Sequence, residues 1–561
     1  MKFTEIPYER ADTALLTAKT EQVTEKISSA SDAKTVLAAL REFEDATRRY
    51  ETMATVAYVR HTVDTRDEFY EKENDFYDEF GPLFQEKTQN LMLAVYSSPF
   101  RKELADELGE VFFKDIELML KGFKPEIIPL MQEENRLSSE YQKLYASTTV
   151  EMDGEILPLT KLAPYKTSPD REVRKKAYML EGEYFENNRE KYDLIFDKLV
   201  KCRTEQAKAL GFDNFVQLGY IRRGRNCYTA EDVEVFRRQV REVLVPIVCR
   251  VKKEQSERIG IADMKLYDDP FIFKDGNPTP KGTPEELLEC ARKMYTSMSK
   301  ETAEFIDAMF EMEMFDLVAK EGKAPGGYCT GLSEYKMPFI FSNFNGTAAD
   351  VDVLTHEAGH AFADYVSARE ISWSFNRQPS MEGCETHSMS MEFLTSDYHE
   401  LFFKEDTAKY SKFHTEDALV FIPYGSMVDH FQQIVYSHPE YTPDERCAAW
   451  LQLEKQYRPY IDYGDVPAYS RGAIWQRQLH IYLYPFYYID YCMAQTIALQ
   501  FFSLYLEDKE KAWEKYMAFV KMGGTETFIG LVKKSGLRSP IDEGSLEKIF
   551  KNITNWLDTL K

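Results

Sequence analysis

Apolar residues recur at helical spacing along most of the chain. From residue 32 towards residue 145 they return every three or four positions, with heavily charged opposite faces. The first such series is Val36, Leu40, Phe43 and Tyr50. At residues 149–159 the pattern changes to the alternation of strands around Asp153-Gly154, a dipeptide that favours a tight hairpin turn. We therefore predict antiparallel helices followed by a short β-hairpin.

Helical patterns also dominate the rest of the chain. They resume at Ser168-Pro-Asp, which has the residues of a helix cap, and extend to about residue 256. Residues 260–284 contain seven glycines and prolines and must be rich in loops. Met337–Phe344 is a short apolar and aromatic run that predicts a strand, and nearly everything after residue 350 is helical again. We find no internal repeat of about 20 to 50 residues, so a solenoid or array fold is not indicated.

The charge of the chain limits the classes of function. It has 70 Lys and Arg residues against 94 Asp and Glu residues, a formal net charge of -24. Such a field repels phosphate backbones and anionic lipids, so we expect neither a nucleic-acid partner nor a membrane partner. The first ten residues lack the apolar core of a signal peptide, and no run of about 18 uncharged apolar residues is found. We therefore expect a cytoplasmic protein.

The composition is that of a globular protein that can bury a large core. Of the 561 residues, 43% are apolar and 29% are charged, which excludes a disordered chain. The eight cysteines are widely scattered and include no Cys-x-x-Cys pair. Neither a disulfide framework nor a thiolate zinc site is indicated.

Residues 350–364 contain the motif His356-Glu357-x-x-His360. Four residues advance a helix by about 400°, so the two imidazoles lie on one face, a turn apart, and can bind one metal ion. Glu357 points about 100° away, close enough to hold a water at the metal without being a ligand. Chance matches to this motif occur in roughly one or two of a hundred such chains, so a third ligand is needed to support a metal site.

Glu385 is the favoured third ligand. It follows His356 by 29 residues, in a segment that we interpret as a helix begun near Gly383. His387 competes with it, but lies about 200° further round that helix, so only one of the two can reach the metal. A carboxylate suits a hydrolytic zinc site because it lowers the metal's charge and leaves bound water polarised. Glu392, two turns further on, is either a hydrogen-bond partner of a ligand histidine or an ordinary solvated glutamate.

The segment from His480 to Tyr491 is unusually rich in tyrosine. Five tyrosines and a histidine fall within twelve residues. Tyr484, Tyr488 and Tyr491 are spaced so that on one helix their hydroxyls would form a single stripe. A neutral phenol is a suitable donor to an oxyanion that forms beside a metal. Any single tyrosine is explained more simply as part of an aromatic core, but for the cluster as a whole we favour a role in catalysis.

These three segments together resemble the thimet-oligopeptidase-like zinc metallopeptidases, specifically the bacterial oligoendopeptidase F branch. The family pattern is a His-Glu-x-x-His helix, a glutamate about 25 to 29 residues later within Glu-x-x-Ser-x-x-x-Glu, and a segment rich in His and Tyr about 100 residues further on. The chain has all three in this order, with Glu385, Ser388 and Glu392 in the second. Residues 168–177 are also similar to the family, whereas residues 1–140 match only in helical character.

The resemblance implies a mainly α-helical fold, in which two helical lobes flank a deep substrate channel and a small β-sheet lies beside the active-site helix. It implies one Zn²⁺ per chain, with His356, His360 and Glu385 as ligands. It implies that residues 339–343 form the edge strand that pairs with an extended substrate. The catalytic residues that follow from the motifs and the resemblance are Glu357, His480, Tyr484, Tyr488 and Tyr491.

We therefore predict a zinc-dependent oligoendopeptidase that hydrolyses internal bonds of short unstructured peptides by metal-activated water. A metallocarboxypeptidase or another exopeptidase is the nearest alternative, since Arg471 and Arg477 could hold a terminal carboxylate, although such arginines more often form surface ion pairs. A non-catalytic peptide-binding protein with a structural metal is a third possibility, but the sequence offers no good fourth ligand. The oligomeric state and the preferred cleavage site are left open.

We divide the chain at about residue 150. Residues 1–150 are expected to form an N-terminal helical lobe or lid, and residues 151–561 the catalytic region. That region would hold the small sheet near residues 325–345 and the zinc site at residues 350–395.

Overall fold

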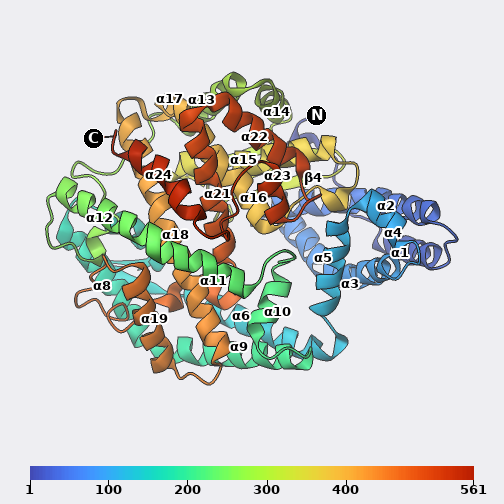
Figure 1. Ribbon diagram of the computed structural model, residues 1–561, viewed down its shortest axis with the longest axis horizontal. Coiled ribbons are helices and arrows are strands. Elements are labelled where there is room, and N and C mark those ends of the chain that lie inside the picture. The colour runs from blue at the N-terminus through green and yellow to red at the C-terminus, as the bar shows by residue number, and fades with distance from the viewer. Residues whose placement is uncertain (561) are drawn as a thin grey trace. The chain divides into compact units, whose positions relative to one another are not determined.

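Helices account for most of the ribbon in Figure 1, which shows a computed structural model. The structure describes residues 1–560, and strands are confined there to two small sheets. The predicted mainly α-helical fold is therefore confirmed. Within these residues no helix combines the length and the apolar character needed to cross a membrane. The cytoplasmic location stays a prediction.

The chain divides into two compact units, each built from separate stretches of sequence. The first unit contains Met1–Leu120, Thr279–Tyr410 and Ile497–Leu537. The second unit is made of Lys121–Pro278, Ser411–Thr496 and Arg538–Lys561. The expected division of function at residue 150 stays a prediction.

The first unit contains a helical core and a three-stranded sheet. The Asp32 side chain accepts a hydrogen bond from the Thr35 amide (2.8 Å) and so begins α2. Val36 and Leu40 on this helix are fully buried in an apolar cluster with residues of α3 to α5. The helices of this unit are α1 (Thr13–Ser28), α2 (Ala33–Val63), α3 (Glu68–Tyr96), α4 (Arg101–Leu108), α5 (Glu110–Lys121), α13 (Pro284–Met298), α14 (Lys300–Glu311), α15 (Ala349–Glu370), α16 (Met381–Leu394), α17 (Glu400–Phe403), α22 (Lys509–Met522) and α23 (Phe528–Lys534), with short 3₁₀ turns at Phe3–Glu5, Ser374–Asn376, Ser396–Tyr398 and Lys404–Asp406.

The sheet of the first unit has the strand order β3-β5-β4. Its strands are β3 (Phe315–Val318), β4 (Tyr328–Leu332) and β5 (Met337–Phe344). The predicted strand β5 is confirmed, and β4 and β5 pack against α15. The expectation that residues 339–343 form an edge is wrong, because β5 pairs with β3 on one side and with β4 on the other. The edge strand beside α15 is β4, which reaches that position through the tight connection from Leu332 to Met337.

The second unit contains the predicted hairpin. β1 (Thr149–Met152) and β2 (Glu155–Pro158) pair antiparallel across Asp153 and Gly154, whose φ angles are 54° and 85°. Such left-handed angles are those that an Asp-Gly turn adopts most readily. The helices of this unit are α6 (Ile128–Ala146), α7 (Ala163–Lys166), α8 (Arg171–Asn187), α9 (Arg189–Ala209), α10 (Phe215–Arg222), α11 (Ala230–Gln239), α12 (Val245–Ile259), α19 (Pro443–Tyr457), α20 (Leu479–Leu483) and α24 (Ser545–Leu557), with 3₁₀ turns at Pro125–Ile127, Leu159–Leu162, Leu266–Asp268 and Ile474–Arg477 and a π-helical turn at Val240–Leu244. Two further helices, α18 (Thr407–Ser437) and α21 (Tyr488–Glu507), contribute residues to both units.

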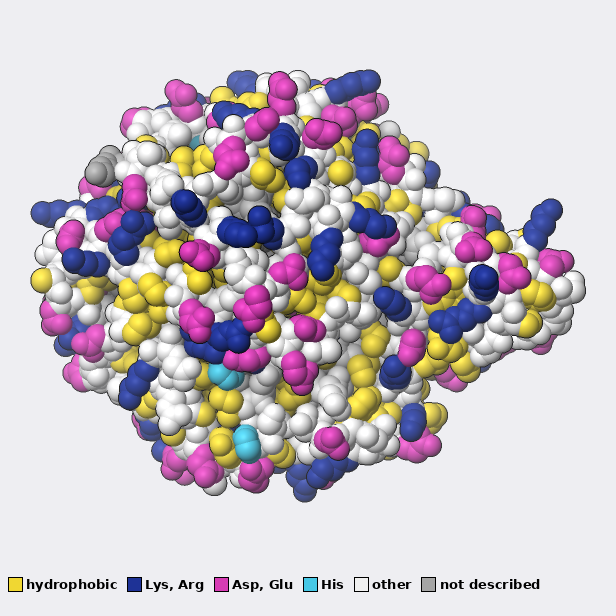
Figure 2. Space-filling view, viewed as in Figure 1, with side chains coloured by type: hydrophobic (Ala, Val, Ile, Leu, Met, Phe, Trp, Pro, Cys, Tyr) yellow, Lys and Arg dark blue, Asp and Glu magenta, His cyan; other side chains and the backbone are white. Residues whose placement is uncertain are grey.

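Charged side chains of both signs are interspersed over the molecular face in Figure 2. Lys and Arg alternate there with Asp and Glu, and do not gather into a basic stripe of the kind that tracks a nucleic-acid backbone.

Candidate active site

Helix α15 presents the His-Glu-x-x-His motif and is held on several sides. Leu354, Ala358 and Phe362 are buried, and the helix packs against β4, β5, α16 and α22. Gly359 lies inside the motif. A Cβ atom there would lie 2.7 Å from the Cα of Ser388 and 2.8 Å from the carbonyl oxygen of His387. The missing side chain therefore lets the backbone of α16 approach α15, a role that we did not predict although a glycine inside a helix is a signal of close packing.

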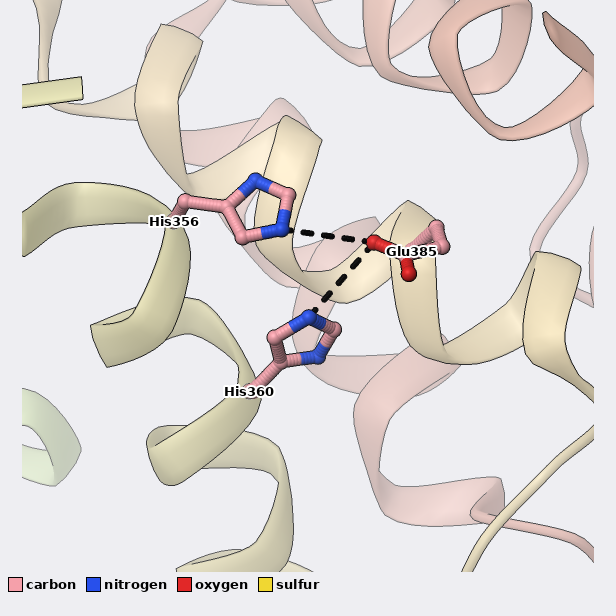
Figure 3. Close-up of side chains that lie close together, drawn as sticks. All are labelled: His356, His360 and Glu385. Carbon is pink, nitrogen blue, oxygen red and sulfur yellow. Dashed lines mark ion pairs between the residues drawn. The ribbon is translucent and has the colours of Figure 1, made fainter. Parts of the chain in front are cut away.

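This close packing brings Glu385 to the two histidines, as Figure 3 shows. The Oε2 atom of Glu385 lies 3.3 Å from Nε2 of His356 and 3.5 Å from Nε2 of His360. The two imidazole rings are 5.0 Å apart and nearly perpendicular. One potential ligand atom from each residue lies within 4.8 Å of the other two. Two histidines one turn apart and a distant carboxylate thus converge on one point.

The three side chains fit a zinc ion. Ligand atoms at about 2.0–2.2 Å from a tetrahedral zinc lie about 3.4 Å from one another. The distances of 3.3 and 3.5 Å between Glu385 and the two histidines have this spacing. The set of two nitrogens and one oxygen is also the one that hydrolytic zinc sites use, with a fourth position left for water.

Neighbouring side chains orient two of the three potential ligands, His356 and Glu385. Glu392 Oε1 lies 2.7 Å from Nδ1 of His356. A hydrogen bond there places the proton on Nδ1 and leaves Nε2 free to bind a metal. The Ser388 hydroxyl donates to Oε2 of Glu385 over 3.2 Å. Glu392 is therefore a hydrogen-bond partner of His356, as the first of the two alternatives for this residue has it, and is not an ordinary solvated glutamate.

His387, the competing ligand, points elsewhere. Its side chain is buried and its ring meets the ring of Phe519 edge-on at 5.3 Å. Burial, and then the charge of His360, lower the pKa of His387 to about 3. The helical geometry that separates residues 385 and 387 by about 200° therefore holds in the structure.

The carboxylate of Glu357 lies near the start of β4. A Cβ atom at Gly327, just before β4, would lie 3.8 Å from Oε1 of Glu357, so this carboxylate faces the start of the edge strand. Burial raises the pKa of Glu357 above its ordinary value, although His356 and His360 act in the opposite direction. A carboxylate in such surroundings binds a proton more readily than one in water.

Residues 484, 488 and 491 do not form the predicted stripe on one helix. Helix α20 ends at Leu483 and α21 begins only at Tyr488, because Pro485 interrupts the helix and Phe486 has a φ angle of 67°. Tyr484 lies outside both helices and is 54% exposed. Tyr488 and Tyr491 lie on the first turn of α21.

His480 and the two helical tyrosines form one cluster in the second unit. The His480 ring lies 4.9 Å from the ring of Tyr488, edge to face, and Tyr491 donates to the Tyr487 hydroxyl over 3.1 Å. Burial and then the charge of Arg223 lower the pKa of His480 to about 4. Burial raises the pKa of Tyr488. Both side chains are therefore neutral at pH 7 and can donate a proton in a hydrogen bond.

Two arginines that we did not predict hold this cluster in place. Arg225 donates to Asp490 Oδ1 over 2.6 Å and to the carbonyl oxygen of Phe486. Arg223 lies 3.2 Å from the other oxygen of Asp490. Both arginines belong to the Arg-Arg-Gly-Arg run that begins at residue 222 and leads from α10 to α11. The run of arginines was the available signal, but its partner lies more than 260 residues away.

Arg471 and Arg477, the candidates for a site that binds a terminal carboxylate, are both close to glutamates. Arg471 donates to Glu186 over 2.9 Å, and Arg477 lies 3.6 Å from Glu181. This is the ion-pair role that we considered more common for such arginines.

Family models and relatives match the chain over most of its length. Residues 164–550 match the model of peptidase family M3, and residues 3–123 match the model of the peptidase M3 N-terminal domain. A solved structure of PZ peptidase A with inhibitor 2 is similar to the whole chain, with 45% identity, a TM-score of 0.92 and coverage of 100% of this chain and 99% of that one. Oligopeptidase PepF of Bacillus subtilis (strain 168) is 22% identical over 530 residues, which cover 86% of this chain and 74% of the relative. The oligoendopeptidase F homolog of Borreliella burgdorferi is 22% identical over 458 residues, 75% of each chain.

Proposed function

This chain belongs to peptidase family M3, and from that premise we propose that His356, His360 and Glu385 bind one zinc ion per molecule. The chain is a metalloendopeptidase that acts on oligopeptides. The observation that carries the zinc proposal is the position of one Glu385 oxygen, 3.3 and 3.5 Å from the Nε2 atoms of the two histidines. Zinc bound there would act as a Lewis acid and lower the pKa of a water molecule towards 7.

Glu357 acts as the general base and then as the general acid. It takes a proton from the attacking water and passes it to the amine that leaves when the peptide bond breaks. The raised pKa of its carboxyl group supports this role, since a base that binds its proton more firmly drives the transfer further. Glu392 holds the His356 ring in the tautomer that leaves Nε2 free.

An oxyanion forms on the substrate when water attacks the peptide carbonyl. It is stabilised by His480, Tyr488 and Tyr491, with Tyr484 as a further donor from its exposed position. The neutral states of His480 and Tyr488 support this proposal, because each keeps a proton to donate at pH 7. One donor of this kind contributes about 10²–10³ to kcat in other enzymes that stabilise an oxyanion.

The substrate binds as an extended strand along the outer edge of β4. This proposal replaces the expected edge at residues 339–343, and it is supported by the carboxylate of Glu357 facing Gly327. Pairing through backbone groups gives affinity without a demand for particular side chains, which suits an enzyme that cuts many short peptides.

Metal content and turnover together test the proposal. The purified protein should contain one zinc per chain and cut an internally quenched peptide that is blocked at both ends, and a chelator should stop cleavage. Glu357→Gln should keep the zinc and lose about 10²–10⁴ in kcat. Full activity in this variant would refute the role of Glu357, and failure to cut the blocked peptide while free ends are trimmed would favour the exopeptidase alternative.

A further inference from the structure

A cavity of about 410 Å³ lies beside the second half of α15 in the first unit. Its walls come from three separate parts of the sequence. They include Glu51 on α2, Thr330 and Gly331 on β4, and Asp364 on α15. This volume is typical of pockets that hold a small ligand or part of a peptide.

Asp364 gives the cavity an unusual polar group. Among residues 1–560 its carboxylate makes neither a hydrogen bond nor an ion pair. Burial raises the pKa of Asp364 to about 6, although Arg377 and Arg369 act in the opposite direction. Asp364 is half-buried, and a carboxylate that is partly removed from water without a partner is costly for the folded chain. A cation in the cavity would relieve that cost.

Strand β4 connects this carboxylate with the catalytic one. A Cβ atom at Gly331 would lie 3.1 Å from Oδ2 of Asp364, just as one at Gly327 would lie 3.8 Å from Oε1 of Glu357. On the helix the two acids are seven residues apart, so they share one face and lie about 10.5 Å apart along the axis. On the strand the two glycines are four residues apart, a length of about 13 Å. The strand therefore runs alongside α15 from the general base to the cavity.

A substrate strand on β4 has a preferred direction. Antiparallel pairing is slightly more stable than parallel pairing. A peptide that runs antiparallel to β4 with its scissile bond beside Glu357 directs its amino-terminal residues towards Gly331 and Asp364. About four extended residues cover the distance, so the amino terminus of a peptide with four residues before the scissile bond would reach the cavity.

We propose that this cavity binds the free α-amino group of a peptide substrate, with Asp364 as its charge partner, and so favours cleavage about four residues from the amino terminus. The inference rests on the proposed function. Glu51, which accepts a hydrogen bond from Ser333 over 2.8 Å, is the second acceptor in the cavity. Lys336 and Arg377, which also line it, are donors for the carbonyl groups of the same peptide.

Two matched peptides test the inference. Both carry four residues before the scissile bond and a quenched fluorophore after it, and one has a free and the other an acetylated amino terminus. The wild type should cut the free peptide with a kcat/KM about 10 to 100 times higher, the size expected for one hydrogen bond to a charged group. Asp364→Asn should cut both peptides alike, at the rate that the wild type has on the acetylated one. Because Asp364 has no partner to lose, the variant should unfold at a temperature no lower than that of the wild type.

Glu370→Gln is the control for the loss of one negative charge from α15, since Glu370 is exposed at the end of that helix. It should keep the preference for the free amino terminus. Equal kcat/KM values for the two peptides in the wild type would overturn the inference, and so would a preference that survives in Asp364→Asn.

Binding separates this inference from the function on which it rests. Calorimetry with Glu357→Gln, which cannot turn the peptides over, should show tighter binding of the free peptide than of the acetylated one. Equal affinities would overturn the amino-group site even if both peptides are cut by the wild type. Tighter binding of the free peptide without any cleavage by the zinc-loaded wild type would support the site and refute the peptidase assignment.

Discussion

Residues 356–385 and residues 480–491 carry the two sets of groups that the proposed mechanism needs, and they are built in different ways. The first set projects from two unbroken helices, α15 and α16. A spacing of four residues puts His356 and His360 on one face of α15, and Gly359 lets α16 come close. The second set belongs to a segment that runs through the five-residue helix α20, a turn at Pro485 and the first turn of α21.

The difference lies in what determines each geometry. Helical periodicity sets the spacing of His356 and His360 and can be calculated from the sequence, and the close contact at Gly359 adds Glu385 from the neighbouring helix. The path of residues 480–491 depends on Arg223 and Arg225, whose contacts with Asp490 join positions more than 260 residues apart. Substitution of one proposed metal ligand should therefore affect metal binding directly. The geometry of the His/Tyr cluster should also change when a distant residue such as Arg225 is substituted.

Loss of a ligand should give the largest effect and should be confined to the first region. Glu385→Ala leaves two nitrogen ligands, too few for a hydrolytic zinc site. After dialysis, metal analysis should find one zinc per chain in the wild type and almost none in the variant, and peptide cleavage should be abolished. Tyr491→Phe is the matched change in the second region and should keep its full zinc. Loss of zinc from Tyr491→Phe would contradict the separation of the two roles.

Loss of the distant arginine that supports the second region should also have a large effect, which should appear in the free energy of unfolding. Arg225 is fully buried and pairs with buried Asp490, so Arg225→Met should lower the free energy of unfolding by about 3–5 kcal/mol. Urea unfolding measures the change. Arg238→Met removes an exposed arginine paired with Glu543, and should leave the free energy of unfolding close to that of the wild type. Equal changes in the two variants would show that Asp490 does not need Arg225.

Much of the fold could be predicted because its elements are defined locally. The Asp153-Gly154 hairpin and the strand Met337–Phe344 lie where the pattern places them. The position of β5 in its sheet could not be predicted, because an apolar run has the same pattern in the middle of a small sheet as at its edge.

The site shows the same limit. The spacing of residues 356, 360 and 385 was enough to propose the metal ligands, and the structure brings these three side chains together. The prediction of one stripe of tyrosines was wrong because it applied helical spacing across Pro485, and a proline inside a helix interrupts it. The contact between Asp490 and Arg225 has no local pattern, since its two partners belong to helices and loops far apart in the chain.

Loss of one oxyanion donor should lower turnover without changing the metal. Tyr488→Phe should reduce kcat by about 10²–10³ and leave KM and zinc content close to those of the wild type. Tyr441→Phe is the control, because Tyr441 also lies in the second unit, where its ring stacks on that of His438, and it has no part in the proposed mechanism. Steady-state kinetics with the blocked peptide measure both variants. An unchanged kcat in Tyr488→Phe would leave this tyrosine with a packing role only.

A subtler change in the first region should weaken zinc binding without abolishing it. Glu392→Gln removes the charge beside Nδ1 of His356 but keeps a hydrogen-bonding side chain of the same size. Zinc affinity should fall about 10- to 100-fold, and cleavage should be restored by added zinc. Competition with a chelator measures the affinity. Full affinity in Glu392→Gln would show that the ring of His356 is held by its packing alone.

The smallest effect should be a change in the pH dependence of stability in the second region. The pKa of His480 is lowered to about 4, first by burial and then by Arg223, whereas an unfolded histidine titrates near pH 6.5. Between about pH 6.5 and pH 4 the unfolded chain therefore binds a proton that folded His480 does not. The free energy of unfolding falls as pH falls through this window, and His480→Gln should remove the share of one proton from that slope. Urea unfolding at several pH values measures this slope. The pKa of His430 is also lowered to about 4, so the contribution of His430 to the slope should remain in the variant. An identical slope in the two proteins would mean that folded His480 titrates like a solvated histidine. The proposal that His480 is held neutral as a hydrogen-bond donor would then be contradicted.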